Sequence, residues 1–103
     1  MTLHHRLIAE FDEFYKVLTG LPYKYEKQDF PAIGYIRKYL LEISKGDEEK
    51  ALNGFKYILT NWKHLSTFHQ SQVKISQINS NLPNIILFIK NARTSKYQHL
   101  IDP

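Results

Sequence analysis

The histidines have the widest chemical repertoire of any side chains in this sequence, because imidazole acts both as a general base and as a metal ligand. His64 and His69 lie five residues apart, off the i, i+4 spacing of a helical pair of metal ligands. Adjacent His4 and His5 would point in different directions on a helix. Cysteine is absent, and from Lys50 to Ile101 no Asp or Glu could orient an imidazole or complete a metal shell. The sequence therefore predicts a protein that is not an enzyme and that holds no metal or cofactor.

The carboxylate-free stretch makes the chain electrically asymmetric along its length. Residues 1–49 carry seven cations and nine acids, whereas residues 50–103 carry seven cations and Asp102 as the one acid. Such a field favours an anionic partner, such as nucleic acid or an acidic protein. A composition rich in Lys, Asn and Ile also follows from AT-rich coding, in which Asn replaces Asp for no binding reason. Both explanations stay open at this point.

The C-terminal half has the residue types that contact DNA, since cations neutralise phosphates and amide side chains pair with adenine edges. The candidate phosphate contacts are Lys74, Lys90, Arg93 and Lys96, and the candidate polar readers are Gln72, Asn79 and Asn81. These cations are sparse and few are arginine. The pattern therefore indicates an anionic partner more strongly than it indicates recognition of a base sequence.

A second hypothesis uses the aromatic residues instead. Tyr23 and Tyr25 alternate with lysines and could stack on bases, although such tyrosines more commonly cover the end of a helical core with their hydroxyls in water. A surface made of Tyr23, Tyr25 and Tyr97 would suit a protein–protein adaptor or a small inhibitor that docks another protein. A second copy of the chain is an alternative occupant, so the oligomeric state stays open and includes a homodimer.

The elements that must position these residues are helices, because apolar residues recur at three- and four-residue spacing. We predict helices over about residues 3–19, 30–45, 47–62, 67–78 and 81–93. Gly20 and Gly46 supply stops, and Asp29 and Asp47 are candidate N-caps. Trp62 falls on the apolar stripe of the third helix, which predicts a core position.

The last two helices are the least regular part of the pattern. Val73 and Ile75 alternate as in a strand, but a strand would have no partner in this chain, so a helix over 67–78 is favoured. Leu65 and Phe68 are expected to hold the preceding connection to the core. Pro83 lacks a backbone donor and clashes with the preceding turn. The pattern thus predicts that a new helix begins near residue 81.

With 103 residues, of which 43% are hydrophobic, the chain has room for one domain and one core. The fold class that these patterns predict is an all-α, single-domain bundle of four or five helices over residues 1–103. The N-terminus lacks the apolar region of a signal peptide, and no run approaches the roughly 18 apolar residues of a membrane span. We therefore expect a cytoplasmic protein with no membrane partner.

Residues 55–92 resemble a segment of small helical domains in phage or prophage replication-module proteins, of the replisome-organiser and helicase-loader kind. The residues that carry the likeness are Trp62 three before Leu65, Phe68 four before Gln72, and the run from Ile78 to Leu82. The loop from Gly20 to Pro22 and the helix start at Asp29 are also similar. The resemblance implies a phage or mobile-element origin and binding to DNA or to a DNA-replication protein. Under the second hypothesis, it implies a small phage-encoded inhibitor that docks a host protein. Such proteins often carry a winged-helix domain, which this chain lacks, and that departure favours a protein partner.

Overall fold

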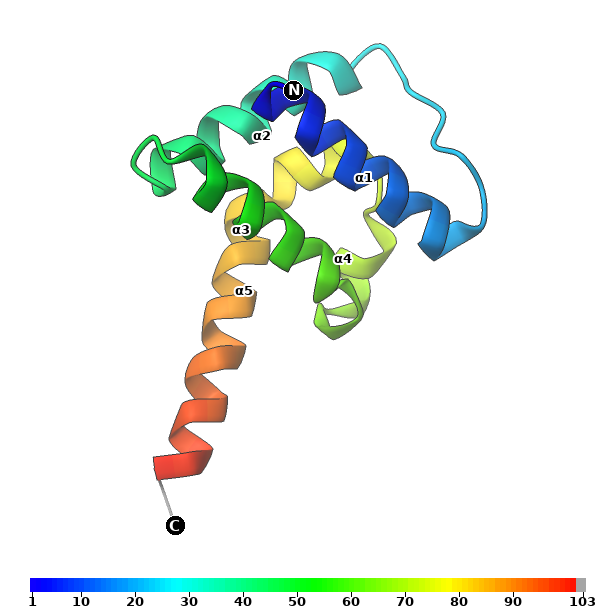
Figure 1. The fold of residues 1–103 in the computed structure, drawn as a ribbon. Coiled ribbons are helices and arrows are strands. Elements are labelled where there is room, and N and C mark those ends of the chain that lie inside the picture. Colours follow the sequence, from blue (N-terminus) through cyan, green and yellow to red (C-terminus); the bar gives the residue numbers. More distant parts are fainter. Residues whose placement is uncertain (102–103) are drawn as a thin grey trace.

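The amphipathic stripes of the sequence form helices in the computed structural model, which describes the backbone of residues 1–101 and the side chains of residues 1–91. Its elements are α1 (Leu3–Thr19), α2 (Asp29–Ile43), α3 (Glu48–Thr60), the 3-10 helix η1 (Trp62–His64), α4 (Thr67–Ser71) and α5 (Ile75–Ile101) (Figure 1). No strand occurs within residues 1–101. The predicted fold class, an all-α bundle, is confirmed.

Local side chains set most of the helix ends. Thr2 caps α1 by accepting a hydrogen bond from the His5 N–H, and the helix stops at Gly20, whose φ of 76° is in the left-handed region. Asp47 caps α3 by accepting from the Lys50 N–H at 3.1 Å, as predicted. Between α2 and α3 the chain turns through two left-handed residues, Lys45 and Gly46. α1 therefore has the predicted bounds, whereas α2 and α3 each end two residues earlier than predicted.

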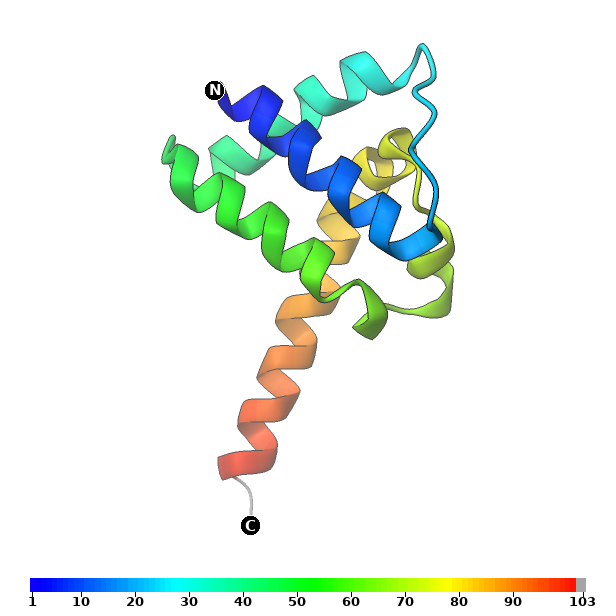
Figure 2. The ribbon, with the colours of Figure 1, turned by 45° about the vertical axis from the view of Figure 1, so that its right-hand side comes forward.

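The core lies where α1, α2 and α3 pack together over the first half of α5. α1 and α3 run side by side, and α5 packs mainly against α2 before it leaves the bundle (Figures 1 and 2). Trp62 is 2% exposed, so its predicted core position is confirmed. The largest fully buried side chains come from all four long helices: Leu7, Phe11, Ile33, Ile36, Leu40, Phe55, Ile75, Ile78, Leu82 and Ile85.

The predicted start of a new helix near residue 81 is wrong, because α5 runs without a break through Pro83. Pro83 is exposed, so the Asn79 carbonyl that loses its helical partner lies on the water side of the helix. The apolar stripe continues across it, with Leu82 and Ile85 buried on either side. Packing of that stripe holds the helix together despite the proline.

The predicted helix over 67–78 is also wrong. α4 ends at Ser71 and α5 begins at Ile75, so residues 72–74 separate two helices. Leu65 is buried as expected, but Phe68 is 61% exposed and does not hold the connection to the core. The core contact in this region is made by Trp62, whose Nε1–H donates to the Gln70 carbonyl at 3.2 Å. The helical spacing of Phe68 and Ile75 in the sequence therefore does not reflect a single helix.

The start of α5 is fixed by Asp29, which was predicted as the N-cap of α2 but is instead its first residue and only 1% exposed. Its Oδ2 accepts hydrogen bonds from the Tyr23 hydroxyl at 2.9 Å and the Glu26 N–H at 2.8 Å. Its Oδ1 accepts from the Ser76 N–H at 3.3 Å. The Tyr23 hydroxyl also accepts from the Ile75 N–H at 3.2 Å. The first amides of α5 are thus capped by residues some 50 positions earlier, and these donors offset the cost of burying a carboxylate.

Tyr23 and Tyr25 cover one end of the core, as the sequence favoured. Tyr23 packs edge-on against Phe11, Tyr15 and Tyr25, with ring centroids 4.8, 4.9 and 5.0 Å away. The expectation that their hydroxyls reach water is wrong for Tyr23, which donates to Asp29 in a part-buried hydrogen bond. The Tyr25 hydroxyl donates to Asp12 at an exposed position. Burial is also the main reason that the pKa values of both hydroxyls are raised. Both hydroxyls therefore serve as internal hydrogen-bond donors.

We predict that Tyr23→Phe lowers the free energy of unfolding by about 1–3 kcal/mol, because Asp29 loses one of its three donors and the Ile75 N–H loses its acceptor. Urea unfolding followed by circular dichroism measures this. Tyr35→Phe is the control, since Tyr35 is 62% exposed and a surface change of this kind costs within about 0.5 kcal/mol. Equal stability of the two variants would contradict the capping role.

The same variant has a pH signature. Burial, aided by the bond to Asp29, raises the pKa of Tyr23 from 10 to about 12. A raised pKa in the folded state contributes stability that is complete below pH 10 and is lost as the pH rises to about 12, because the unfolded chain ionises first. The stability difference between wild type and Tyr23→Phe should therefore shrink over pH 10–12.

We predict that Pro83→Ala raises the free energy of unfolding by about 1–3 kcal/mol, because it restores the α5 hydrogen bond to Asn79 and removes the ring's clash. Chemical unfolding and amide exchange along α5 measure the gain. Asn84→Ala at the neighbouring exposed position gains helix propensity alone, about 0.5 kcal/mol. A Pro83→Ala protein no more stable than Asn84→Ala would show that the proline costs the helix nothing.

Candidate functional site

The predicted nucleic-acid-binding residues are spread along and just before α5. Gln72 and Lys74 lie between α4 and α5, and Asn79, Asn81 and Lys90 lie on α5 itself. The backbones of residues 93 and 96 continue this helix, but the side chains of Arg93 and Lys96 lie outside the described residues, as does that of Tyr97.

The predicted binding residues whose side chains are described do not converge on one face of α5. Asn79 and Asn81 are two positions apart, about 200° around a helix, so they point to nearly opposite sides. Asn79, with Leu82 and Pro83, lines a hollow against α2. Lys90 lies some 16 Å further along the helix axis than Asn79, by about 1.5 Å per residue. The structure therefore brings together no compact set of polar readers.

Two ion pairs place acids of the N-terminal half next to cations of the carboxylate-free half. The Lys74 Nζ lies 3.1 Å from Glu26, and the Lys56 Nζ lies 3.8 Å from Glu10. The hydrogen bond from Lys74 also lowers the pKa of the Glu26 carboxyl. In both pairs a C-terminal cation meets an N-terminal acid. The charge asymmetry along the sequence is thus partly cancelled in space.

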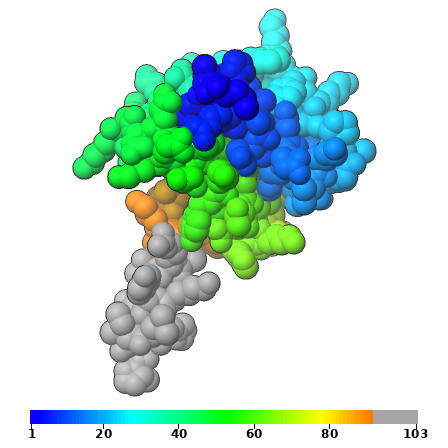
Figure 3. Space-filling view, in the orientation of Figure 1, coloured from blue at the N-terminus to red at the C-terminus, as the bar shows by residue number. Residues whose placement is uncertain are grey.

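The most unusual part of α5 is Ile85–Ile89, a run of five apolar residues. Five successive positions cover every side of a helix, and a helix that is apolar all round is normally buried. Here Ile85 is fully buried and Ile86 and Ile89 are half-buried, but Leu87 is 56% and Phe88 37% exposed. At this point α5 emerges from beneath the bundle, as its orange segment does in Figure 3. Sequence reasoning missed this surface, although the unbroken apolar run was its signal.

Other helices add exposed apolar side chains around the same point. Ile43 of α2 and Tyr57 of α3 line a small cavity of about 160 Å³ that Ile86 and Ile89 of α5 complete. On another side of α5 the His69 ring lies 6.4 Å from the Phe88 ring, and Phe68 is next to it. We call the exposed apolar side chains around the emerging helix the α5 collar: Ile43, Tyr57, Phe68, Leu87 and Phe88.

The described part of the structure assembles no cluster of metal-binding side chains. Within residues 1–91, no three His, Asp or Glu side chains are placed to hold a metal ion. His69 has a structural contact, since its Nδ1 lies 3.0 Å from the Ser66 hydroxyl that caps α4.

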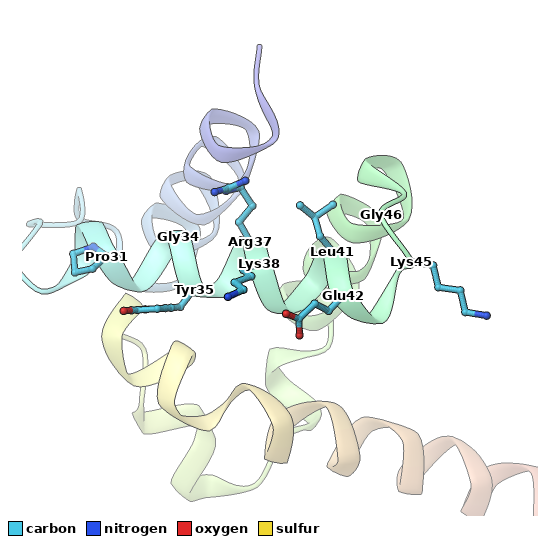
Figure 4. Close-up of a pocket in the computed structure, with 9 residues that line it drawn as sticks. All are labelled: Pro31, Gly34, Tyr35, Arg37, Lys38, Leu41, Glu42, Lys45 and Gly46. Atoms are coloured by element: carbon cyan, nitrogen blue, oxygen red, sulfur yellow. The ribbon is translucent and has the colours of Figure 1, made fainter.

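A hollow of about 700 Å³ lies along α2. Its side chains diverge, with Arg37 on one side of the helix, Tyr35 and Glu42 on the α5 side, and Lys45 pointing away (Figure 4). Groups that diverge in this way cannot converge on one ligand.

Comparisons with known proteins give no relative: no family model, no curated protein and no solved structure matches this chain. Within the described residues, none of the helices combines the length and the apolarity that crossing a membrane requires.

We predict that truncating a buried and an exposed side chain of the apolar run changes the free energy of unfolding by very different amounts. Ile85→Ala should lower the free energy of unfolding by about 2–4 kcal/mol, because it leaves a cavity in the core. Leu87→Ala, at an exposed position two residues later, should change it by no more than about 0.5 kcal/mol. Urea unfolding measures both. A large loss with Leu87→Ala would mean that the collar already belongs to the core of the isolated chain.

Proposed function

We propose that this chain is a non-enzymatic binding protein whose α5 collar docks on a partner protein with an apolar surface rimmed by carboxylates. The observation that carries the proposal is the run Ile85–Ile89, which is apolar on every side of the helix and leaves Leu87 and Phe88 in water. Exposed apolar groups gathered from several elements are typical of interaction surfaces.

The charge of the surroundings selects the partner's chemistry. From Lys50 to Ile101 the chain has no carboxylate. Lys90 also lines the small cavity that Ile43 and Tyr57 form with α5. A rim of Asp or Glu on the partner would complement this field and speed association.

A protein fits this surface better than DNA does. Leu87 and Phe88 need apolar surface to cover them, whereas a duplex presents mainly phosphates and polar groove edges. The DNA-binding hypothesis also needs Asn79 and Asn81 on a common face, and on α5 they point apart. If the likeness of residues 55–92 to phage replication modules reflects descent, the partner would be a replication protein.

The test uses a synthetic amphipathic helical peptide with a leucine ridge flanked by glutamates, the acidic peptide, and a basic peptide with lysines in place of the glutamates. We expect the wild-type protein to bind the acidic peptide more tightly than the basic one. The double variant Leu87→Ser, Phe88→Ser should weaken binding at least tenfold, because each side chain contributes on the order of 1 kcal/mol when it is buried. Calorimetry measures the affinities.

Leu21→Ser is the matched control, since Leu21 is a 62% exposed apolar residue outside the collar and should not affect binding. Duplex and single-stranded DNA are titrated in parallel over a salt series. DNA binding with a steep salt dependence that the double variant leaves intact, without peptide binding, would replace the proposal with the DNA function. Sedimentation that shows self-association, abolished by the double variant, would assign the collar to a second copy.

A further inference from the structure

A second surface lies between α1 and α3, away from the collar. Its hollow has a volume of about 440 Å³. On α1, positions 10, 13, 14, 17 and 18 follow one helical stripe, and on the other side positions 56, 59, 60 and 63 do the same. The side chains of α1 (blue) and α3 (green) meet along the front of the molecule in Figure 3. We call this hollow the α1–α3 groove.

The floor of the groove is apolar. Trp62 is 2% exposed, and Phe14 packs edge-on against it with ring centroids 5.3 Å apart. The α1 wall, by contrast, puts apolar side chains into water, since Val17 is 77% and Leu18 41% exposed. The core stripe of α1 does not need Val17. The groove thus offers apolar surface that the fold itself leaves uncovered.

The two walls carry opposite charges. The α1 wall has Glu10 and Glu13, and the wall formed by α3 and η1 has Lys56 and Lys63. Glu10 and Lys56 pair across the groove at 3.8 Å. Within the part of the chain whose side chains are described, no ion pair includes Glu13 or Lys63. One end of the groove is therefore bridged, and the other end holds an acid on one wall and a cation on the opposite wall.

From this arrangement we infer that the α1–α3 groove binds an amphipathic helix of a partner protein. The apolar ridge of that helix lies over Val17, Leu18 and Phe14. A basic residue on one of its flanks meets Glu13, and an acidic residue on the other flank meets Lys63. Two opposite walls fix the direction in which the helix lies, because turning it end to end exchanges its flanks.

The length of the groove suits this occupant. On the α1 wall, position 17 lies seven residues beyond position 10 within one helix, which corresponds to about two helical turns, or roughly 10 Å. Two turns of a docked helix present apolar residues at i, i+3 or i+4 and i+7, the usual anchors of helix-in-groove recognition. The proposal does not depend on the α5 collar, which lies on other residues and selects a partner with acids on both flanks.

Trp62 provides the readout, because it is the one tryptophan of the chain and forms the groove floor. The probe is a helical peptide with a leucine ridge, lysines along one flank and glutamates along the other, the mixed peptide. Its titration should change Trp62 emission. Val17→Ser should weaken binding of the mixed peptide roughly tenfold, because it removes apolar surface that the peptide would bury. Position 17 is too exposed for the change to affect folding.

Charge reversal tests the orientation. Lys63→Glu puts acids on both walls at the end of the groove that the Glu10–Lys56 pair does not bridge. It should therefore weaken binding of the mixed peptide about fivefold and make a peptide with lysines on both flanks the tightest ligand. Lys38→Glu is the matched control, because Lys38 is an equally exposed cation on α2, outside the groove. The Lys38→Glu variant should bind the peptides in the same order of affinity as the wild type. The double variant in the collar should leave the mixed peptide's affinity unchanged, which separates this result from that of the proposed function.

Several outcomes would overturn the inference. An unchanged Trp62 emission, or a change that persists in Val17→Ser, would show that the groove is not the site. Equal affinities for the mixed peptide and for peptides with a single charge type would remove the role of the charged walls. Concentration-dependent self-association that Val17→Ser abolishes would assign the groove to a second copy of this chain.

Discussion

The carboxylate of Asp29 is the constraint on which the arrangement of the helices depends. It is almost fully buried, and its three hydrogen-bond donors come from the Tyr23 hydroxyl, the turn that precedes α2, and the first turn of α5. A buried carboxylate without such donors would cost several kcal/mol, so these parts must come together for the chain to fold. Asp29 therefore fixes where α5 begins and how it meets α2.

The placement of α5 decides which surfaces the protein offers. Because its first turns are anchored at one end of the bundle, the buried stripe ends at Ile85 and the rest of the apolar run is carried to the edge of the core. Leu87 and Phe88 then remain exposed on the stretch of helix whose Ile86 and Ile89 complete a cavity with Ile43 of α2 and Tyr57 of α3. α1 and α3 pack together in the same core and leave Val17 exposed in the hollow that Trp62 also lines. Both candidate surfaces thus follow from how four amphipathic stripes share a single core.

The two surfaces differ in charge, and the two proposals accordingly name different partners. Four of the five residues of the α5 collar, all but Ile43, lie in the carboxylate-free stretch from Lys50 to Ile101, which suits an acidic rim. The α1–α3 groove combines the acids of the N-terminal half with cations of the C-terminal half on opposite walls. If both proposals hold, the chain would bring two different proteins together.

The sequence by itself determined the all-α fold, the bounds of α1, the caps at Gly20 and Asp47, and the burial of Trp62, because apolar periodicity and capping are local properties. It did not determine the course of the chain after Trp62. The caps of α5 come from Tyr23 and Asp29, and the buried residues on both sides of Pro83 override its local preference, so only the tertiary structure decided where that helix begins and that it continues. The same holds for the candidate surfaces. Exposure of Leu87 and pairing of Lys74 with Glu26 depend on which distant helix lies nearby, and no local pattern encodes that.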